Sequence, residues 1–402
     1  MRLQLTIIFL LLVPLCCLSQ SDSIRNRKLT KSEINFVYGY YEQDGDNAAV
    51  TGGQGTEELT ANIPRIILYV PTKGYSGFTI DAGVTVYSSA STDNIDFVMS
   101  SASSEEAHTS INLTYQWQDK KETTYAVKGN FDVESDYLSR GFGLSSTIPI
   151  SKAKKFSWSV YSYFDDLRWG WLDPGEWRGQ TLIYPAELRD TTWFDTNKRT
   201  SILTDFSYSN RISNRLRFQL SQGIYYQRGL LSTPFHRVYF RDEVLPRVEN
   251  LPDERWKSSS AFRVNYFLND WLIVKTFHRF YGDSFGITSY TTELELPMKI
   301  SFALTAYPIL RFHTQNGARF WEPFKEHESD AEYYASDYDL STFHAYTTGF
   351  GLRYTPAFGL FNKERALDKS VIKSLGLRVS KYSRSDGLDA WVGSFRMSIG
   401  KL

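Results

Sequence analysis

The chain has 402 residues, and its 45 Lys and Arg side chains balance 45 Asp and Glu side chains. A chain without net charge creates no bulk field that would attract a polyanion, so we expect no nucleic-acid partner. Aromatic residues make up 16% of the chain although its mean hydropathy is only −0.36, and no segment after the amino-terminal residues is long and apolar enough for a membrane helix. Two classes remain: a soluble secreted β-protein with an aromatic core, or a membrane barrel whose aromatic side chains face lipid.

The amino-terminal residues predict a secretory signal peptide. Arg2 provides a short positive region, an apolar run extends from Leu3 to Leu15, and small residues follow it. The run is shorter than the roughly 20 residues that a helix needs to span a bilayer. We therefore expect cleavage between Ser19 and Gln20, with residues 1–19 as the signal peptide and residues 20–402 as the mature barrel domain.

Both cysteines, Cys16 and Cys17, precede the expected cleavage site. The mature chain is then expected to form no disulfide and no thiolate metal site. A lipoprotein acylated at one of these cysteines is the alternative, although Leu15 is a poor choice for the small residue that should precede the acylated one.

Apolar and polar residues alternate through most of the mature chain, which is the period of a strand with two different faces. One segment places Ile111, Leu113, Tyr115 and Trp117 on a single face. Most segments run to ten residues or more, close to the 9 to 11 that a tilted strand needs to cross lipid, whereas strands of soluble sandwiches average about five or six. We expect the polar faces to line a lumen, with these lining residues: Asn112, Gln116, Lys128, Asp132, Glu134, Glu293, Glu295 and Arg396.

Short and long connections alternate along the chain. The short ones are Pro71–Gly74, Asp119–Lys121, Ser151–Lys154, Ser213–Arg215, Asn269–Asp270 and Pro297–Lys299. The long ones are Asp44–Thr56, Ser89–His108, Asp166–Asn197, Gly229–Trp256 and Gln315–Phe343. Outer-membrane barrels place their long loops outside the cell. The pattern predicts an all-β fold, an antiparallel transmembrane β-barrel of about 16 strands, with 14 as the alternative count and the long loops extracellular.

Two strands at the ends of the domain deserve separate predictions. The segment Ile34–Tyr41 is the weakest strand and is interpreted as either a wall strand or an inner or terminal piece. The last strand alternates through Met397 and Ile399, as barrel-assembly signals do, but ends in Leu402 instead of an aromatic residue. The expected partners are outer-membrane lipid, lipopolysaccharide and the barrel-assembly machinery, and the expected location is the bacterial outer membrane after secretory export.

Several segments resemble the uncharacterised outer-membrane barrel family catalogued as domain-of-unknown-function family 3570. They are residues 38–46, 49–59, 89–96, 100–104, 229–240, 251–255 and 334–341. The resemblance implies a secreted outer-membrane protein, often from Bacteroidota-like bacteria. It also implies a frequent genomic setting beside thioredoxin-like proteins and a flavin transferase that acts on secreted proteins, and hence a periplasmic or lipoprotein redox partner.

The loops hold the candidate binding residues. His236 and Arg237 are placed to face a ligand or the acids of another loop, and the binding residues we name are His236, Arg237, Asp337 and Asp339. The alternative is that the segment 231–240 folds into the barrel as a constriction. A calcium site in the loops would use Asp44, Asp46, Asp93 and Asp96, since hard cations accept carboxylates from separate loops.

Other chemistry finds little support in the sequence. The stretch Gly52-Gly53-Gln54-Gly55 lacks a following helix, so its glycines are interpreted as permitting positive φ in a turn. The six histidines show no zinc spacing, and no G-x-S-x-G motif occurs. We expect no enzyme and no cofactor other than loop calcium. Three functions are carried forward: a channel for small solutes, a non-conducting barrel that binds a partner, and, last, a barrel hydrolase.

Overall fold

The computed structural model describes residues 31–89, 105–134, 137–167, 198–233, 236–361 and 370–401. The expected cleavage site at Ser19 and Gln20 therefore lies outside the described residues. Among the described residues, no helix has the length and apolar character needed to cross a membrane. The strands are β1 (Glu33–Asp44), β2 (Leu59–Pro71), β3 (Ser76–Ser89), β4 (Glu105–Gln118), β5 (Thr124–Val133), β6 (Tyr137–Pro149), β7 (Lys154–Leu167), β8 (Lys198–Arg211), β9 (Leu216–Gly229), β12 (Glu254–Phe267), β13 (Ile273–Asp283), β14 (Thr288–Glu295), β15 (Met298–Lys299), β16 (Leu304–Gln315), β17 (Phe343–Tyr354), β18 (Ser370–Arg384) and β19 (Asp389–Lys401).

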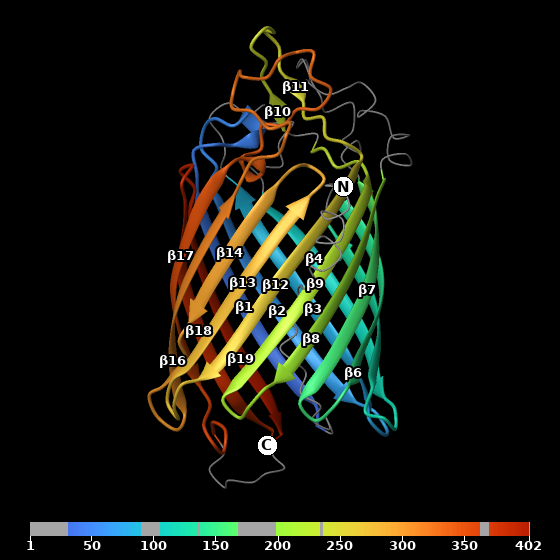
Figure 1. The fold of residues 1–402 in the computed structure, drawn as a ribbon, viewed down its shortest axis with the longest axis vertical. Helices are drawn as coiled ribbons and strands as arrows, with labels where there is room; N and C mark the ends of the chain where they lie inside the picture. Colours follow the sequence, from blue (N-terminus) through green and yellow to red (C-terminus); the bar gives the residue numbers. More distant parts are fainter. Residues whose placement is uncertain are drawn as a thin grey trace, which may run out of the picture.

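These strands form one closed antiparallel barrel (Figure 1). Each strand pairs with its neighbours along the chain, and the wall closes where β1 pairs with β19 from Glu33↔Gly400 to Asp44↔Asp389. Closure leaves no strand edge in the wall, so the backbone groups of the wall are hydrogen-bonded without water, as a bilayer interior requires. The sheet's 17 strands occupy 16 wall positions, because β14 and β15 share one. The expected fold class and strand number are confirmed.

The break between β14 and β15 corrects one predicted turn. The strand does not turn at Pro297–Lys299: Met298 pairs with Ala306 in β16, and the chain turns at residues 300–303. Pro297 has no N–H to donate to the ladder, so it interrupts the strand without ending it. The segment Ile34–Tyr41, whose place was open, lies within β1 and is a full member of the wall.

The two rims of the barrel differ in their connections. The rim that holds the end of β19 carries the short connections 72–75, 119–123, 150–153, 212–215, 268–272 and 300–303. At the opposite rim the described chain carries the long connections 45–58, 230–253 and 316–342 and the short ones 284–287 and 385–388, and β3, β5 and β7 end there. The strands β10 (Arg237–Val238) and β11 (Arg247–Val248) pair with each other and lie above this long-loop rim, not inside the wall (Figure 1). Among the described residues, the segment 231–240 thus forms no constriction within the wall.

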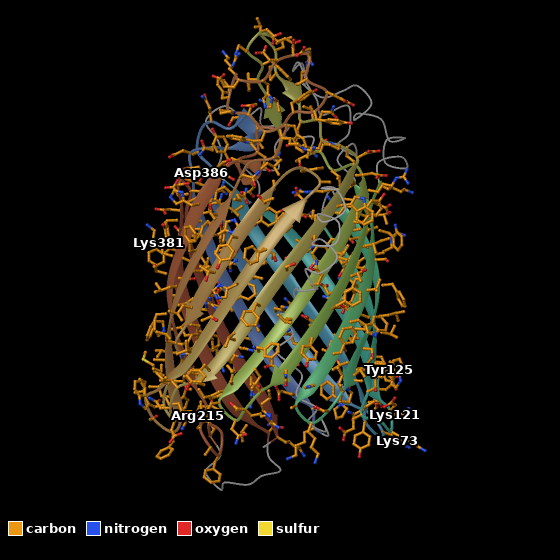
Figure 2. All side chains as sticks on the ribbon, viewed as in Figure 1. Lys73, Lys121, Tyr125, Arg215, Lys381 and Asp386 are labelled. Atoms are coloured by element: carbon orange, nitrogen blue, oxygen red, sulfur yellow. The ribbon has the colours of Figure 1, made fainter. Side chains whose placement is uncertain are left out.

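The outer face of the wall is apolar. Leu113 is 49% exposed and Phe142 is 53% exposed, and Ile111, Trp117 and Phe131 belong to the same face. Figure 2 shows Tyr125, the register partner of Trp117, and Lys381, the partner of Trp391, on the outside of the wall. Because side chains alternate along a strand, the residues between these positions face the interior.

Candidate functional site

The structure places the sequence-predicted lining residues on the inner face of the wall. Asn112 and Gln116 alternate with the exposed Ile111, Leu113 and Tyr115. The register carries the same face into the following strand and around the barrel, through pairs such as Thr114↔Lys128, Ser110↔Asp132, Lys275↔Glu295 and Val37↔Arg396. Glu134 directly follows β5 and continues the face of Asp132 at the long-loop rim. No described residue among the eight lies on the outer face.

Neighbouring strands link these residues on the inner wall. Asn130 donates from Nδ2 to Asn112 Oδ1 at 3.0 Å, and the Lys128 ammonium lies 5.3 Å from the ring centroid of Tyr161. Across β13 and β14, Lys275 Nζ lies 2.6 Å from Glu295 Oε1. These contacts fix a polar lining of both charge signs, in contrast to the apolar outer face.

The lining arginines that the sequence analysis missed include Arg65, Arg279, Arg311, Arg353 and Arg378. The register places each on the inner face, for example through Glu293↔Arg311 and Gly351↔Arg378. The alternation of faces in the sequence could have identified them, because each of these arginines lies between two residues of the opposite face. Arg311, for example, lies between Leu310 and Phe312. Leu310 is 55% exposed on the outer wall.

A second polar site lies above the long-loop rim. We call it the loop cluster: the described residues of 45–58, 230–253 and 316–342, with the turn 385–388. Its parts, which come from distant regions of the sequence, pack together: Ala48, Val238, Phe240 and Ala335 are all buried. Ser336 Oγ donates to the Arg237 carbonyl oxygen at 2.8 Å, and Asn47 Nδ2 donates to the Asp386 carbonyl oxygen at 2.6 Å. The loops thus share one small core.

Close backbone packing in the loop cluster depends on two glycines. Gly52 and Gly53 have φ of 82° and 87°, a conformation that side-chain-bearing residues rarely adopt. A Cβ at Gly52 would meet the ring of Tyr239, and one at Gly53 would lie 2.7 Å from Tyr338 Cε2. The expectation that these glycines permit positive φ is confirmed.

The four residues predicted to bind a ligand all lie in the loop cluster. His236 Nδ1 lies 3.4 Å from Glu249 Oε2, and the η5 turn (Tyr338–Leu340) begins where Asp337 Oδ1 accepts from the Asp339 backbone N–H at 2.8 Å. Arg237 is buried. Burial opposes protonation of His236, but the Glu249 carboxylate outweighs it and raises the pKa of His236 to about 9.

Acidic groups in the same cluster are hard to ionise. Burial raises the pKa of Asp337 to about 6, although the neighbouring His236 acts in the opposite direction. Burial, followed by repulsion from Asp339 and Asp337, raises the pKa of Glu57 to about 7. The predicted residues therefore contact other groups of the loop cluster itself, and their engagement with an external ligand stays a prediction.

Arg384 joins the loop cluster to the wall. It is the last residue of β18, and its side chain is only 4% exposed. Its Nε donates to Asp386 Oδ1 at 3.0 Å, its Nη2 donates to the Tyr338 carbonyl oxygen at 2.8 Å, and it forms an ion pair with Asp339. The guanidinium carbon also lies 4.0 Å from the ring centroid of Phe343. One buried cation thus links two loops to the start of β17.

The calcium prediction reaches beyond the described part of the chain. Asp44 ends β1 opposite Asp389, and Asp46 lies near Gly387, but Asp93 and Asp96 lie outside the described residues. Within the described residues, no group of three or more His, Cys, Asp or Glu side chains is arranged to hold a metal ion. The four-aspartate site stays a prediction.

Comparison with known proteins gives a family. The family model described as "Protein of unknown function (DUF3570)" matches residues 10–363. No curated protein matches the chain. Similar solved structures include a "Bacterial polysaccharide outer membrane secretin", with 10% identity, a TM-score of 0.49, and coverage of 92% of this chain and 98% of that chain. OccD3 (OpdP) of Pseudomonas aeruginosa has 7% identity, a TM-score of 0.42 and 92% coverage of both chains. OccAB3 of Acinetobacter baumannii has 10% identity, a TM-score of 0.41, and coverage of 92% of this chain and 99% of that chain.

Identities this low concern the fold alone. The family match, by contrast, spans most of the sequence and agrees with the family that the loop segments resemble. The chain therefore belongs to the DUF3570 family of proteins of unknown function.

Proposed function

We propose that this protein is a channel for small solutes in the bacterial outer membrane. The observation that carries the proposal is the contrast between the two faces of a closed wall. Outward residues such as Leu113 and Phe142 are apolar and exposed, whereas inward residues on the same strands are polar or charged. An apolar outer belt is stable in lipid, and a polar interior is stable against water.

The exposure of inner charges supports a wet interior. The side chain of Arg65 is 47% exposed, and those of Lys275 and Arg311 are each 39% exposed, although all three face inward. Charged groups in a dry interior would need complete pairing, because an unsolvated charge is very costly. Solvated charges along the inner wall are what a water-filled pathway would have.

The proposal includes location and partners. Lipid and lipopolysaccharide would contact the outer belt, after export through the secretory pathway and insertion by the barrel-assembly machinery. The alternating residues of β19 that would present an assembly signal, Met397 and Ile399, lie on the outer face with Phe395. The activity we propose is passive movement of solutes, not catalysis.

Liposome swelling tests the proposal. The purified, refolded barrel is reconstituted into liposomes, which are diluted into isotonic solutions of amino acids or sugars of increasing size. We expect swelling with small solutes and a size cut-off. The control is the same liposome without protein. A barrel that is folded, as shown by its altered migration on unheated gels, but never permits swelling would contradict the proposal.

One observation favours a second candidate, a barrel that binds a partner through its loops. Loop residues at the long-loop rim form a buried core of their own, in which Ala335 packs with Phe285, Ile287, Ala318 and Leu340, and this gives the rim a defined surface. The partner would be a lipoprotein or a redox protein of the cell envelope. Affinity capture from detergent extracts tests this: recovery of the same partner by the native protein, but not by a variant lacking residues 236–253, would favour binding over transport.

A further inference from the structure

Charge is unevenly distributed over the inner wall, although the whole chain is neutral. On the wall from β13 through β19 to β3, the inward cations other than the rim residues Arg384 and Lys299 are Lys275, Arg279, Arg311, Arg353, Lys373, Arg378, Arg396 and Arg65. The described inward acids of the same strands, other than the rim residue Asp283, which pairs with Arg255, are Glu293, Glu295, Glu33 and Asp81. Cations outnumber acids on this half of the lining.

The rest of the wall does not reverse this excess. Its inward acids include Asp132, Asp165 and Asp205, and its inward cations include Lys128, Arg199, Lys257 and Arg263. Charges on the outer face lie near the rims, as Arg140 and Asp166 do, and form their own ion pair. The neutral composition of the chain therefore conceals a basic lumen.

Each acid on the basic side already has a cationic partner. Glu295 pairs with Lys275 at 2.6 Å, and Glu33 pairs with Lys373 at 2.8 Å. Asp81 accepts from Arg65 Nε at 2.6 Å, and Glu293 lies 3.8 Å from Arg311. All four of these acids are thus paired with a cation, and further inward arginines are not paired with any of them.

Three of the other arginines, Arg353, Arg378 and Arg279, have few or no partners among the described residues. Within the described residues, no ion pair or hydrogen bond holds the side chain of Arg353 or Arg378. Arg279 reaches Thr291 Oγ1 only at 3.5 Å, and its Nε is buried with no partner among the described atoms. A guanidinium has five N–H donors in a planar fork that fits carboxylate and phosphate oxygens. These side chains therefore keep donors for an anion from solution.

The arginines also lie at similar heights. A register row is the line of residues that pair from one strand to the next. Because the strands of such barrels tilt by about 35–45°, a register row rises along the barrel axis by about 3 Å per strand. Two residues along one strand differ in height by about 5 Å. Val37 is the register partner of both Arg396 and Arg65, so these two arginines lie in one register row. Gly376 of β18 is the other register partner of Arg396, and Arg378 lies two residues after Gly376 on the same strand. The rise of the register rows largely cancels the differences in position of these arginines along their strands. Arg311, Arg378, Arg396 and Arg65 therefore lie at similar heights and form one band. We call it the arginine band.

We propose that the arginine band makes the channel selective for small anions that carry carboxylate or phosphate groups. The inference rests on the proposed channel function and specifies its solutes. An excess of cations over acids on one side of a low-dielectric wall focuses its field into the lumen and raises the local concentration of anions. Small or aliphatic residues between the arginines, Val37 and Gly376, leave the guanidinium groups accessible from the lumen.

Reversal potentials in planar bilayers test the inference. The wild-type barrel is inserted between two concentrations of KCl, and the ratio of chloride to potassium permeability is measured. We expect chloride preference in the wild type. The double variant Arg378→Gln with Arg396→Gln should lower the ratio by roughly twofold or more, because two charges leave the band. Arg215→Gln is the matched control, since Arg215 lies in a turn at the short-turn rim (Figure 2).

Competing anions identify the chemical class. Sodium succinate and sodium phosphate are added separately to one side, and each should reduce chloride current through the wild type more than through the double variant. Conductance with potassium preference, or with a ratio that the double variant leaves unchanged, would overturn the anion inference while leaving a channel. A folded barrel without any conductance would overturn the channel itself.

Discussion

The ring of Tyr161 on β7 lies against the backbone of Gly143 on β6, where the two residues are register partners on the inner wall. A Cβ at position 143 would overlap the ring. We expect Gly143→Ala to lower the stability of the barrel by about 1–3 kcal/mol, because the ring must leave its position over the strand. Gly129→Ala is the control, since no heavy atom lies within 4 Å of the added Cβ. The urea midpoint of the gel-migration shift measures both, and equal midpoints would count against this packing.

Adjacent residues of β4 test the assignment of faces. Leu113 is 49% exposed on the outer wall, and Asn112 faces inward. Leu113→Lys should destabilise the folded barrel in liposomes by about 2–4 kcal/mol, because it places a charge in lipid. Asn112→Lys should cost much less, since its register partner Asp81 is acidic and the interior is polar. The same loss in both variants would refute the inner and outer faces as described.

The buried guanidinium of Arg384 should be essential to the loop cluster but not to the barrel. Arg384→Gln leaves the Asp386 carboxylate buried without its cation, a type of change that costs about 3–5 kcal/mol locally. We expect faster proteolytic cleavage within residues 316–342 and an unchanged gel-migration shift. The control Arg241→Gln removes a cation that is 56% exposed beside Glu326 and Glu328, and should have little effect. Equal cleavage rates for the two variants would contradict the assigned role.

Rising pH should loosen the loop cluster. The pKa of Glu57 rises from 4.5 to about 7 and that of Asp337 from 3.8 to about 6, so the folded cluster holds protons that the unfolded loops have released. The bound protons stabilise the folded loop cluster at low pH, and this stabilisation is lost as pH rises through about 7. The pKa of His236 rises from 6.5 to about 9, so its contribution is present below pH 6.5 and is lost as pH approaches 9.

All three groups act in the same direction. Hydrogen exchange of the loop amides, corrected for the intrinsic effect of pH, should show lower protection at pH 9 than at pH 5.5. Glu57→Gln should make this dependence shallower, because one of the titrating groups is gone. Protection that increases with pH would contradict the arrangement of charges around His236 and Glu57.

The wall could be predicted from the sequence because its physics is periodic. Alternation over ten or more residues specifies a two-faced strand, so the face of residues such as Asn112 and Glu293 follows from their neighbours. The turn after β14 could not be placed in the same way. Pro297 predicts a turn by its missing N–H, but the ladder resumes after it at Met298 because β16 continues alongside.

The loop cluster shows where sequence reasoning ends. The sequence predicts His236 and Asp337 as binding residues, but the carboxylate that pairs with His236 is Glu249, and the cation that pairs with Asp339 is Arg384. These contacts join segments that are far apart in the chain, and no local period relates them. The excess of lumen cations was equally hidden, because it appears only when every strand's inner face is assigned together.

The most direct test of the channel is chemical modification from the lumen during current recording. Ser394 faces inward between Arg378 and Gly39, and the next residue, Phe395, faces outward. Ser394→Cys and Phe395→Cys are made in the mature chain, which is expected to have no cysteine of its own, and treated with a negatively charged, membrane-impermeant methanethiosulfonate. The channel predicts a lasting fall in current through the Ser394→Cys barrel and no change through the Phe395→Cys barrel. A current that the reagent leaves unchanged in both, or a folded barrel that carries no current, would contradict it.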